Sequence, residues 1–280
     1  MSYKIIGDSC TDLTPDLKKD PHFQIIPLIL QVGNTQIIDD ETFDQKRFLE
    51  LVKGSSESPK TACPSPELYK EAFECEEEEV FVVTLSEHLS GSYNSAVLGK
   101  KLYEEEHGKD SKKIAVFGSD SASCGQLNIA IYIQSLCQAS LPFEEIEDKV
   151  RAYIKNMRTY FVLESLDTLR KNGRLTGLQA FFATALNIKP VMGAESGVII
   201  KLDQARGINK ALTRMADIAI KEAGDTRNKV LAIAHCNNPE RAEFVKQEML
   251  KRGAFKDIMI TDTAGVATVY ANDGGIIMTL

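Results

Sequence analysis

Short apolar segments alternate with helical patterns through the first half of this 280-residue chain. The segments at 4–7, 80–85 and 113–118 have the length of buried strands, and the helical patterns at 92–105 and 125–139 follow the second and third of them. Buried strands that are each followed by a helix belong to parallel sheets, because the chain must cross over before it can run in the same direction again. The pattern therefore predicts an α/β fold built on a parallel sheet.

The strand and helix patterns divide the chain into two predicted domains. Residues 1–158 would form the parallel-sheet α/β domain, with a small hairpin insertion near 23–60. Pro27 interrupts an apolar run in this insertion, which favours an edge or bent strand, and a helix is expected at 13–19. From 159 to 280, hairpin patterns occur together with helices, so this part is predicted to be an α+β domain.

Polar residues directly follow three of the predicted strands, in the segments Asp8-Ser9, 86–92 and Asp120-Ser121. In open α/β sheets, ligands bind at the carboxyl ends of the strands, so we expect these three loops to converge on one site. Ser9 and Ser121 are candidates for support around that site, although each could instead cap the helix that follows its strand. Asp8 and Asp120 could orient the loops through hydrogen bonds.

Two hydroxyl-rich segments are the strongest candidates for direct contact with a ligand. They read Thr61-Ala62-Cys63-Pro64-Ser65-Pro66 and Leu89-Ser90-Gly91-Ser92-Tyr93-Asn94-Ser95-Ala96. Serine hydroxyls and the N–H groups at a helix start together suit an anion. No lysine or arginine occurs from 71 to 99, so neutral donors would hold it, which suits one carboxylate better than a nucleotide triphosphate. The structural alternatives are a turn before prolines at Thr61 and helix caps at the serines.

Composition argues against several other classes of function. The net charge of −7, from 40 acidic and 33 basic residues, does not suit a broad nucleic-acid-binding surface. No apolar stretch approaches the roughly 20 residues that span a bilayer, and the first residues lack the features of a signal peptide. Six cysteines without a C-x-x-C pair are expected to be reduced thiols, and four scattered histidines form no local metal motif. We therefore expect a cytoplasmic protein without a metal.

Two enzyme classes and a sensor remain as alternatives to a binding protein. A serine hydrolase could use Ser90 with His88 nearby, but neighbours on one loop rarely align as nucleophile and base, and G-x-S-x-G is lacking. A phosphotransferase would need a nucleotide cradle or a metal cluster, and G-x-x-x-x-G-K-S/T is lacking. A sensor of a small acid would use the same edge of the sheet, with a small polar pocket.

The ordered motifs of the chain resemble those of the DegV family of bacterial fatty-acid-binding proteins. Beside the two hydroxyl-rich segments, the matching motifs are Asp8-Ser9-x-x-Asp12-Leu13, Asp120-Ser121, Leu163-x-Ser165-Leu166-x-Thr168-Leu169-x-x-x-Gly173-Arg174, Leu186-Asn187-Ile188-Lys189-Pro190 and His235-x-Asn237-x-Pro239-x-x-Ala242. Each motif is weak alone, but this order over the full length is specific to the family.

The resemblance implies a two-domain protein that encloses one long-chain fatty acid and has no catalysis of its own. The acyl chain would lie in an apolar tunnel of the C-terminal domain, and the carboxylate would meet hydroxyls at the domain junction. In some bacteria such proteins present the fatty acid to a separate fatty acid kinase, which makes acyl phosphate for phospholipid synthesis. The fatty acid would be the ligand, with no cofactor, no nucleic acid and no stable insertion in a membrane.

The resemblance also implies which residues contact each part of the ligand. Thr61 and Ser90 would hold the carboxylate, and support would come from three neighbours of Ser90, namely Ser92, Asn94 and Ser95. The phosphate side or the partner would be met by Arg174, Arg206 and Tyr270. The segment around Arg206 departs from the family's basic run, and Tyr270 stands where the family often has a histidine.

Apolar residues of the second half are candidates for the tunnel wall, although an ordinary core would look the same in the sequence. The candidates are Phe181, Phe182 and Leu186, on a helix predicted at 178–186, and Met192. Burial of an acyl chain contributes about 0.8 kcal/mol for each methylene. The chain would therefore supply most of the binding energy, and the hydroxyls would fix its orientation.

Overall fold

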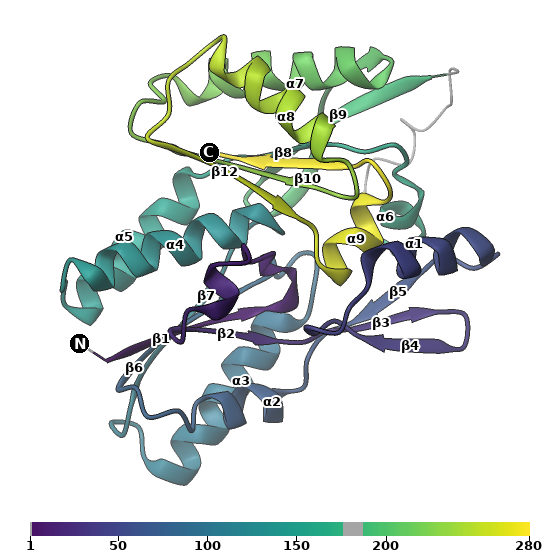
Figure 1. The fold of residues 1–280 in the computed structure, drawn as a ribbon. Helices are drawn as coiled ribbons and strands as arrows, with labels where there is room; N and C mark the ends of the chain where they lie inside the picture. The colour runs from purple at the N-terminus through teal and green to yellow at the C-terminus, as the bar shows by residue number, and fades with distance from the viewer. Residues whose placement is uncertain (1, 176–186) are drawn as a thin grey trace.

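The computed structural model of the protein describes residues 2–175 and 187–280. In Figure 1 the layers follow one another from top to bottom as helices, a mixed sheet, a helical layer, a parallel sheet and helices. The described residues form these two sheets and a third, smaller one. None of the described helices has both the length and the apolar character needed to cross a membrane.

The four-stranded sheet is parallel, with the order β2-β1-β6-β7. Its strands are β1 (Tyr3–Asp8), β2 (Phe23–Ile26), β6 (Glu79–Thr84) and β7 (Lys113–Gly118). Four helices cover its two faces, namely α2 (Pro66–Ala72), α3 (Ser92–His107), α4 (Cys124–Gln138) and α5 (Phe143–Asn156). Alternate side chains face opposite sides, so that Phe81 and Val83 pack against α4 and α5 whereas Val80 and Val82 pack against α2 and α3. The predicted α/β architecture is therefore confirmed.

The six-stranded sheet is mixed, with the order β10-β9-β8-β13-β11-β12. Its strands are β8 (Thr159–Val162), β9 (Ile188–Glu195), β10 (Val198–Arg206), β11 (Val230–His235), β12 (Asp257–Asp262) and β13 (Ile276–Thr279). Helices α7 (Ile208–Ala223) and α8 (Pro239–Leu250) cover one face. On the other face Cys124 of α4 packs against Ala232 and Ala234 of β11. Helix α4 thus separates the two large sheets and contacts both of them.

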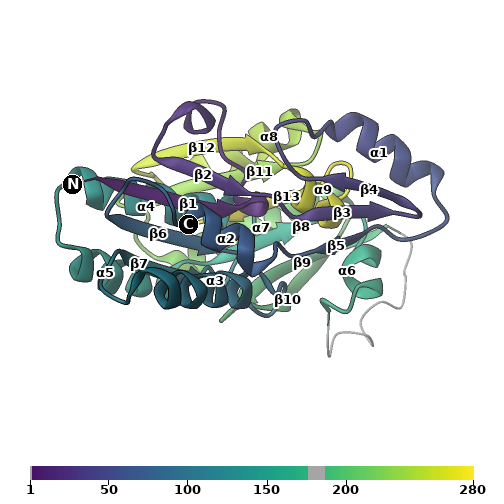
Figure 2. The ribbon, with the colours of Figure 1, turned by 90° about the horizontal axis from the view of Figure 1, so that it is seen from below.

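A three-stranded antiparallel sheet extends from the side of the molecule, where Figure 2 shows it beside α1 (Gln45–Gly54) and α9 (Gly265–Ala271). It consists of β3 (Ile29–Val32), β4 (Thr35–Ile38) and β5 (Lys60–Ala62). The predicted break at Pro27 is confirmed, because β2 lies at the edge of the parallel sheet and the chain enters this second sheet after it. Helices α1 (Gln45–Gly54), α6 (Asp167–Lys171) and α9 (Gly265–Ala271) complete the described elements.

The prediction of a helix at 13–19 is wrong. The segment contains one short 3-10 turn, Leu17–Lys19, and a second such turn at Ser9–Thr11 precedes it. Asp12 between them has a φ of 49°, in the left-handed region, and separates the two turns. The carboxylate of Asp12 also bonds to the backbone of Ala264, so a distant contact sets the local conformation. The helix predicted at 178–186 lies outside the described residues.

Candidate functional site

The loops after β1, β6 and β7 meet at the carboxyl edge of the parallel sheet, as predicted. Asp8 ties them together from a fully buried position: its carboxylate accepts hydrogen bonds from the Leu85 amide at 2.7 Å and the Gln126 side chain at 2.8 Å. The amide of Ser86 donates to the carbonyl of Ser121 at 3.0 Å. Burial raises the pKa of Asp8, and its hydrogen bonds oppose that rise. Asp8 therefore orients the loops through hydrogen bonds, as the sequence had suggested for this residue.

A cavity of about 90 Å³ lies between these loops and the six-stranded sheet. Alternate residues of β8 and the residue after it, Thr159, Phe161 and Leu163, form one wall because they share a face of the sheet. The other lining residues come from the loops, from β5, from α6 and the residues after it, from β9 to β10, from β13 and from α9: Cys10, Thr61, Leu85, Leu89, Ser90, Asp120, Ser121, Ala122, Leu169, Arg174, Ala194, Gly197, Ile199, Val266, Ala267, Tyr270, Ala271 and Ile277. The wall is mainly apolar, with a few polar groups.

Four of the residues predicted to contact the ligand line this cavity: Thr61, Ser90, Arg174 and Tyr270. The hydroxyls of Thr61 and Tyr270 are 2.9 Å apart, although 209 positions separate them in the sequence. The guanidinium of Arg174 lies over the ring of Tyr270, 5.6 Å from its centroid, and its Nε donates to the carbonyl of Leu89 at 3.2 Å. Ser90 is half-buried and also lines the cavity. Hydroxyl groups and one cation are therefore available to a negatively charged group in the cavity.

The other serines and Asn94 near Ser90 do not line the cavity. Ser92 is buried behind Ser90, with their hydroxyl oxygens 3.1 Å apart, and its amide donates to the Ser90 hydroxyl. Asn94 is exposed, and the Ser95 hydroxyl donates to the sulfur of Cys63. Ser92 can therefore orient Ser90, whereas Asn94 and Ser95 face other directions of helix α3.

The two serines proposed as support have different surroundings. Ser121 lines the cavity, and its hydroxyl lies 2.7 Å from that of Thr159. Ser9 lies outside the lining and accepts a hydrogen bond from the Leu28 amide at 3.1 Å. Asp120 also lines the cavity; its pKa is raised by burial and, to a smaller extent, by Glu87.

The remaining predicted residues are placed away from the cavity or outside the described part. Arg206 is exposed at the end of β10. Met192 is buried in the cluster that contains Phe161 and Leu163, so it packs behind the cavity wall without lining the cavity. The three other tunnel candidates, Phe181, Phe182 and Leu186, lie outside the described residues.

Sequence reasoning missed helix α9, which supplies four of the lining residues. They are Val266, Ala267, Tyr270 and Ala271. It also missed Ile199 and Ala194, which face each other on β10 and β9. The alternation of Thr159, Phe161 and Leu163 is the signal in the sequence that indicates one wall, because alternate residues of a strand share a face.

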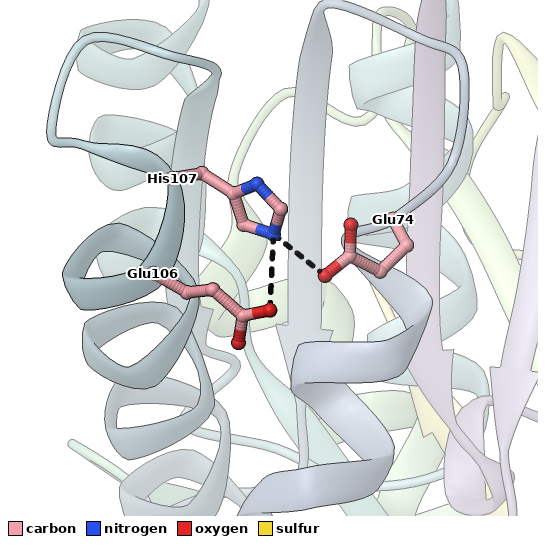
Figure 3. A group of neighbouring side chains, drawn as sticks. All are labelled: Glu74, Glu106 and His107. Carbon is pink, nitrogen blue, oxygen red and sulfur yellow. Dashed lines mark hydrogen bonds and ion pairs between the residues drawn. The ribbon is translucent and has the colours of Figure 1, made fainter.

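Among the described residues, one group of possible metal ligands comes together, and Figure 3 shows it. The Nε2 of His107 is 2.9 Å from a carboxylate oxygen of Glu74 and 4.0 Å from one of Glu106. Lys70 adds an ammonium group 2.7 Å from Glu106 and 3.8 Å from Glu74. The group is exposed at the far end of α3 from Ser90, so it is an ion-pair network on the surface and not part of the cavity.

The pair proposed for a serine hydrolase is not hydrogen-bonded within the described part of the chain. The Ser90 hydroxyl has Ser92 as its side-chain partner. His88 is exposed, and its backbone amide donates to the Ser86 hydroxyl at 3.3 Å. The geometry therefore gives Ser90 the surroundings of a hydrogen-bond donor, not those of an activated nucleophile.

A sequence profile of the DegV family, described as an uncharacterised protein family, matches residues 2–278. A DegV domain-containing protein of Streptococcus pneumoniae (strain ATCC BAA-255 / R6) is 34% identical over 282 residues, which is 99% of this chain and 98% of the relative. A crystal structure of a DegV family protein from Ruminococcus gnavus ATCC 29149, with vaccenic acid, is 50% identical and has a TM-score of 0.97 over 100% of both chains. The Fatty Acid Kinase (Fak) B3 protein of Streptococcus pneumoniae, loaded with linoleic acid, is 33% identical and has a TM-score of 0.88 over 100% of this chain and 99% of the other.

Proposed function

The chain belongs to the DegV family, and we propose that it binds one long-chain fatty acid whose polar end lies in the cavity between the loops and the six-stranded sheet. The carboxylate would meet Thr61 and Ser90, and the acyl chain would lie against the apolar wall. The observation that carries the proposal is the cavity itself, in which apolar side chains form most of the wall and hydroxyls from distant segments come together. Two relatives with known structures, at 50% and 33% identity, hold a fatty acid.

The physical chemistry of the cavity suits this ligand. Each buried methylene contributes about 0.8 kcal/mol, so a chain of sixteen or more carbons can offset the cost of ordering both molecules. An ionised carboxylate must keep hydrogen bonds when it leaves water. Thr61, Ser90 and Tyr270 can donate to it, and Arg174 adds a positive charge beside Tyr270. The polar residues would then fix which end of the ligand lies at Thr61.

We propose further that the protein is a carrier that presents the fatty acid to a separate kinase. The name of the Streptococcus pneumoniae neighbour, Fatty Acid Kinase (Fak) B3 protein, supports this role. Arg174 and Tyr270 lie at the polar part of the cavity, where a carboxylate would receive a phosphoryl group. Arg206 is exposed elsewhere, so its contribution would be contact with the partner. We propose that the carrier and its kinase would meet in the cytoplasm.

The distribution of strands supports the proposed domains at 1–158 and 159–280. All strands of the parallel sheet end by Gly118, and all strands of the six-stranded sheet start at Thr159 or later. Residues from both parts line the cavity, so the ligand would lie at the junction between the domains.

The proposal is tested by comparing two ligands that differ only at the polar end. Delipidated protein is titrated with oleate and with methyl oleate, and bound ligand is measured by native mass spectrometry. We expect oleate to bind in a one-to-one ratio and the ester at least tenfold more weakly, because the ester cannot present a charged acceptor to the hydroxyls and Arg174. Equal binding of the two would refute the placement of the carboxylate, and binding of neither would refute the function.

A further inference from the structure

Helix α9 is a wall of the cavity whose position depends on contacts from the opposite end of the chain. It supplies Tyr270, and the Tyr270 hydroxyl meets Thr61 at 2.9 Å. The helix has seven residues, carries no acidic side chain in its first turn and has no side-chain cap of its own. The N–H groups at a helix start need acceptors, so the groups that supply them also decide where the helix lies.

Two buried carboxylates accept hydrogen bonds from three consecutive amides at this helix start. The Ala264 amide donates to Asp12 at 2.7 Å, the Gly265 amide to one oxygen of Asp39 at 2.7 Å, and the Val266 amide to its other oxygen at 2.8 Å. Both carboxylates are 2% exposed. Asp12 follows β1 and Asp39 follows β4, more than 220 positions before the helix in the sequence. The bidentate contact of Asp39 fixes the direction as well as the position of α9.

The backbone at Gly265 packs closely against Asp39 and Leu30. A Cβ atom added to this glycine would be 2.5 Å from an oxygen of Asp39 and 2.6 Å from a side-chain carbon of Leu30. The backbone of α9 is therefore pressed directly against the carboxylate. The side chain of Gln45, at the start of α1, makes a further contact before the helix: its Nε2 donates to the Thr263 carbonyl at 2.9 Å.

We propose that Asp12 and Asp39 are positioning residues of the fatty-acid site: they hold α9, and through it Tyr270, against Thr61. This inference rests on the proposed function and adds to it residues that do not themselves line the cavity. The two aspartates act on the ligand site through the helix, because each binds backbone amides at the start of α9 and neither lines the cavity. The same contacts join the N-terminal part of the chain to the segment before β13. The contacts that hold α9 therefore belong to the same structural unit as the ligand site.

The test uses Asp39→Asn, which keeps the size of the side chain but removes its charge and one of its two acceptors. The matched control is Asp40→Asn, since the neighbouring carboxylate bonds to Thr42 and not to α9. We expect Asp39→Asn to weaken oleate binding about tenfold, because displacement of α9 would take the Tyr270 hydroxyl, a donor to the charged carboxylate, away from the ligand. Amide hydrogen exchange should rise in α9 and stay unchanged in α7. Asp40→Asn should leave both measurements unchanged.

A double-mutant cycle with Tyr270→Phe separates positioning from general destabilisation. If Asp39 acts through Tyr270, Asp39→Asn should weaken oleate binding less than threefold once the Tyr270 hydroxyl is absent, because the two changes then remove the same interaction. Gly265→Ala perturbs the same contact from the helix side and should reproduce the effect of Asp39→Asn. Wild-type affinity in Asp39→Asn, or the full tenfold loss in the Tyr270→Phe background, would overturn the inference. Failure of the wild-type protein to bind oleate would instead refute the proposed function, and the inference with it.

Discussion

Replacement of Thr61 by valine tests the polar end of the site with the smallest change in shape. Thr61 is half-exposed in β5, and its hydroxyl has the Tyr270 hydroxyl 2.9 Å away. Valine keeps the branched shape that suits a strand, and the lost hydrogen bond between two neutral groups is worth about 1 kcal/mol. The unfolding free energy should therefore fall by about 1 kcal/mol at most, and the variant should remain folded.

Ligand binding should change much more than stability. A hydrogen bond to a charged acceptor contributes about 1.5–3 kcal/mol, and 1.4 kcal/mol corresponds to a factor of ten in affinity, so oleate should bind roughly 10- to 100-fold more weakly to Thr61→Val. Affinity can be measured by displacing a fluorescent fatty-acid analogue from delipidated protein. The chain contains no tryptophan, so its own fluorescence interferes little.

The matched control for this prediction is Thr35→Val, the same substitution at an exposed strand position away from the cavity. It should leave the affinity for oleate unchanged. Wild-type affinity in Thr61→Val would refute the reasoning, because the hydroxyl would then make no contact with the ligand. An equal loss in both variants would show that the substitution acts through stability and not through the site.

Three further predictions concern the ligand site, the two aspartates that contact α9, and the packing of α2 against α3. Ser90→Ala should weaken oleate binding about tenfold with little change in stability, since it removes one donor to a charged group; an unchanged displacement curve would place the carboxylate elsewhere. Burial raises the pKa of Asp39 to about 6 and that of Asp12 to about 8, so the folded chain binds more protons than the unfolded chain between about pH 4 and 8. The unfolding free energy should therefore contain a component that falls as the pH rises through this window. Urea denaturation at several pH values should show a smaller fall of the unfolding free energy for Asp39→Asn than for the wild type. The same dependence on pH in both proteins would contradict the raised pKa of Asp39. Gly99→Ala should destabilise the protein by about 1–3 kcal/mol, because its Cβ would lie 2.6 Å from the Pro66 carbonyl oxygen and 2.7 Å from the Cβ of Tyr69; a gain in urea resistance would show that α2 and α3 can separate at no cost.

The parallel sheet was predictable because its pattern is local. Each strand is a short apolar run, and the helix that follows it is amphipathic or apolar over several turns. Helix α9 gives no such signal. It begins with Gly265 and contains Val266, Thr268 and Val269, which are poor helix formers, and the groups that cap it come from Asp12 and Asp39. A helix held by distant carboxylates cannot be read from its own seven residues.

The site was predictable in its main residues but not in its geometry. The motifs selected Thr61, Ser90, Arg174 and Tyr270, and the structure brings all four to one cavity. The motif around Ser90 also selected Asn94 and Ser95 because they are close in sequence. Both lie on helix α3, where successive residues turn by about 100°, so residues that are close to Ser90 in sequence need not point toward the cavity. The contact between Thr61 and Tyr270 depends on α9, and therefore on contacts that the sequence does not reveal.

The central claim, that the protein binds a fatty acid with its polar end in this cavity, is tested most directly by native mass spectrometry of the protein as purified. We predict a mass a few hundred daltons above that of the bare chain, loss of this excess on delipidation, and its return in a one-to-one ratio with added oleate. Extraction of the bound molecule should yield a long-chain fatty acid. A bare chain that takes up neither oleate nor palmitate after delipidation would contradict the account.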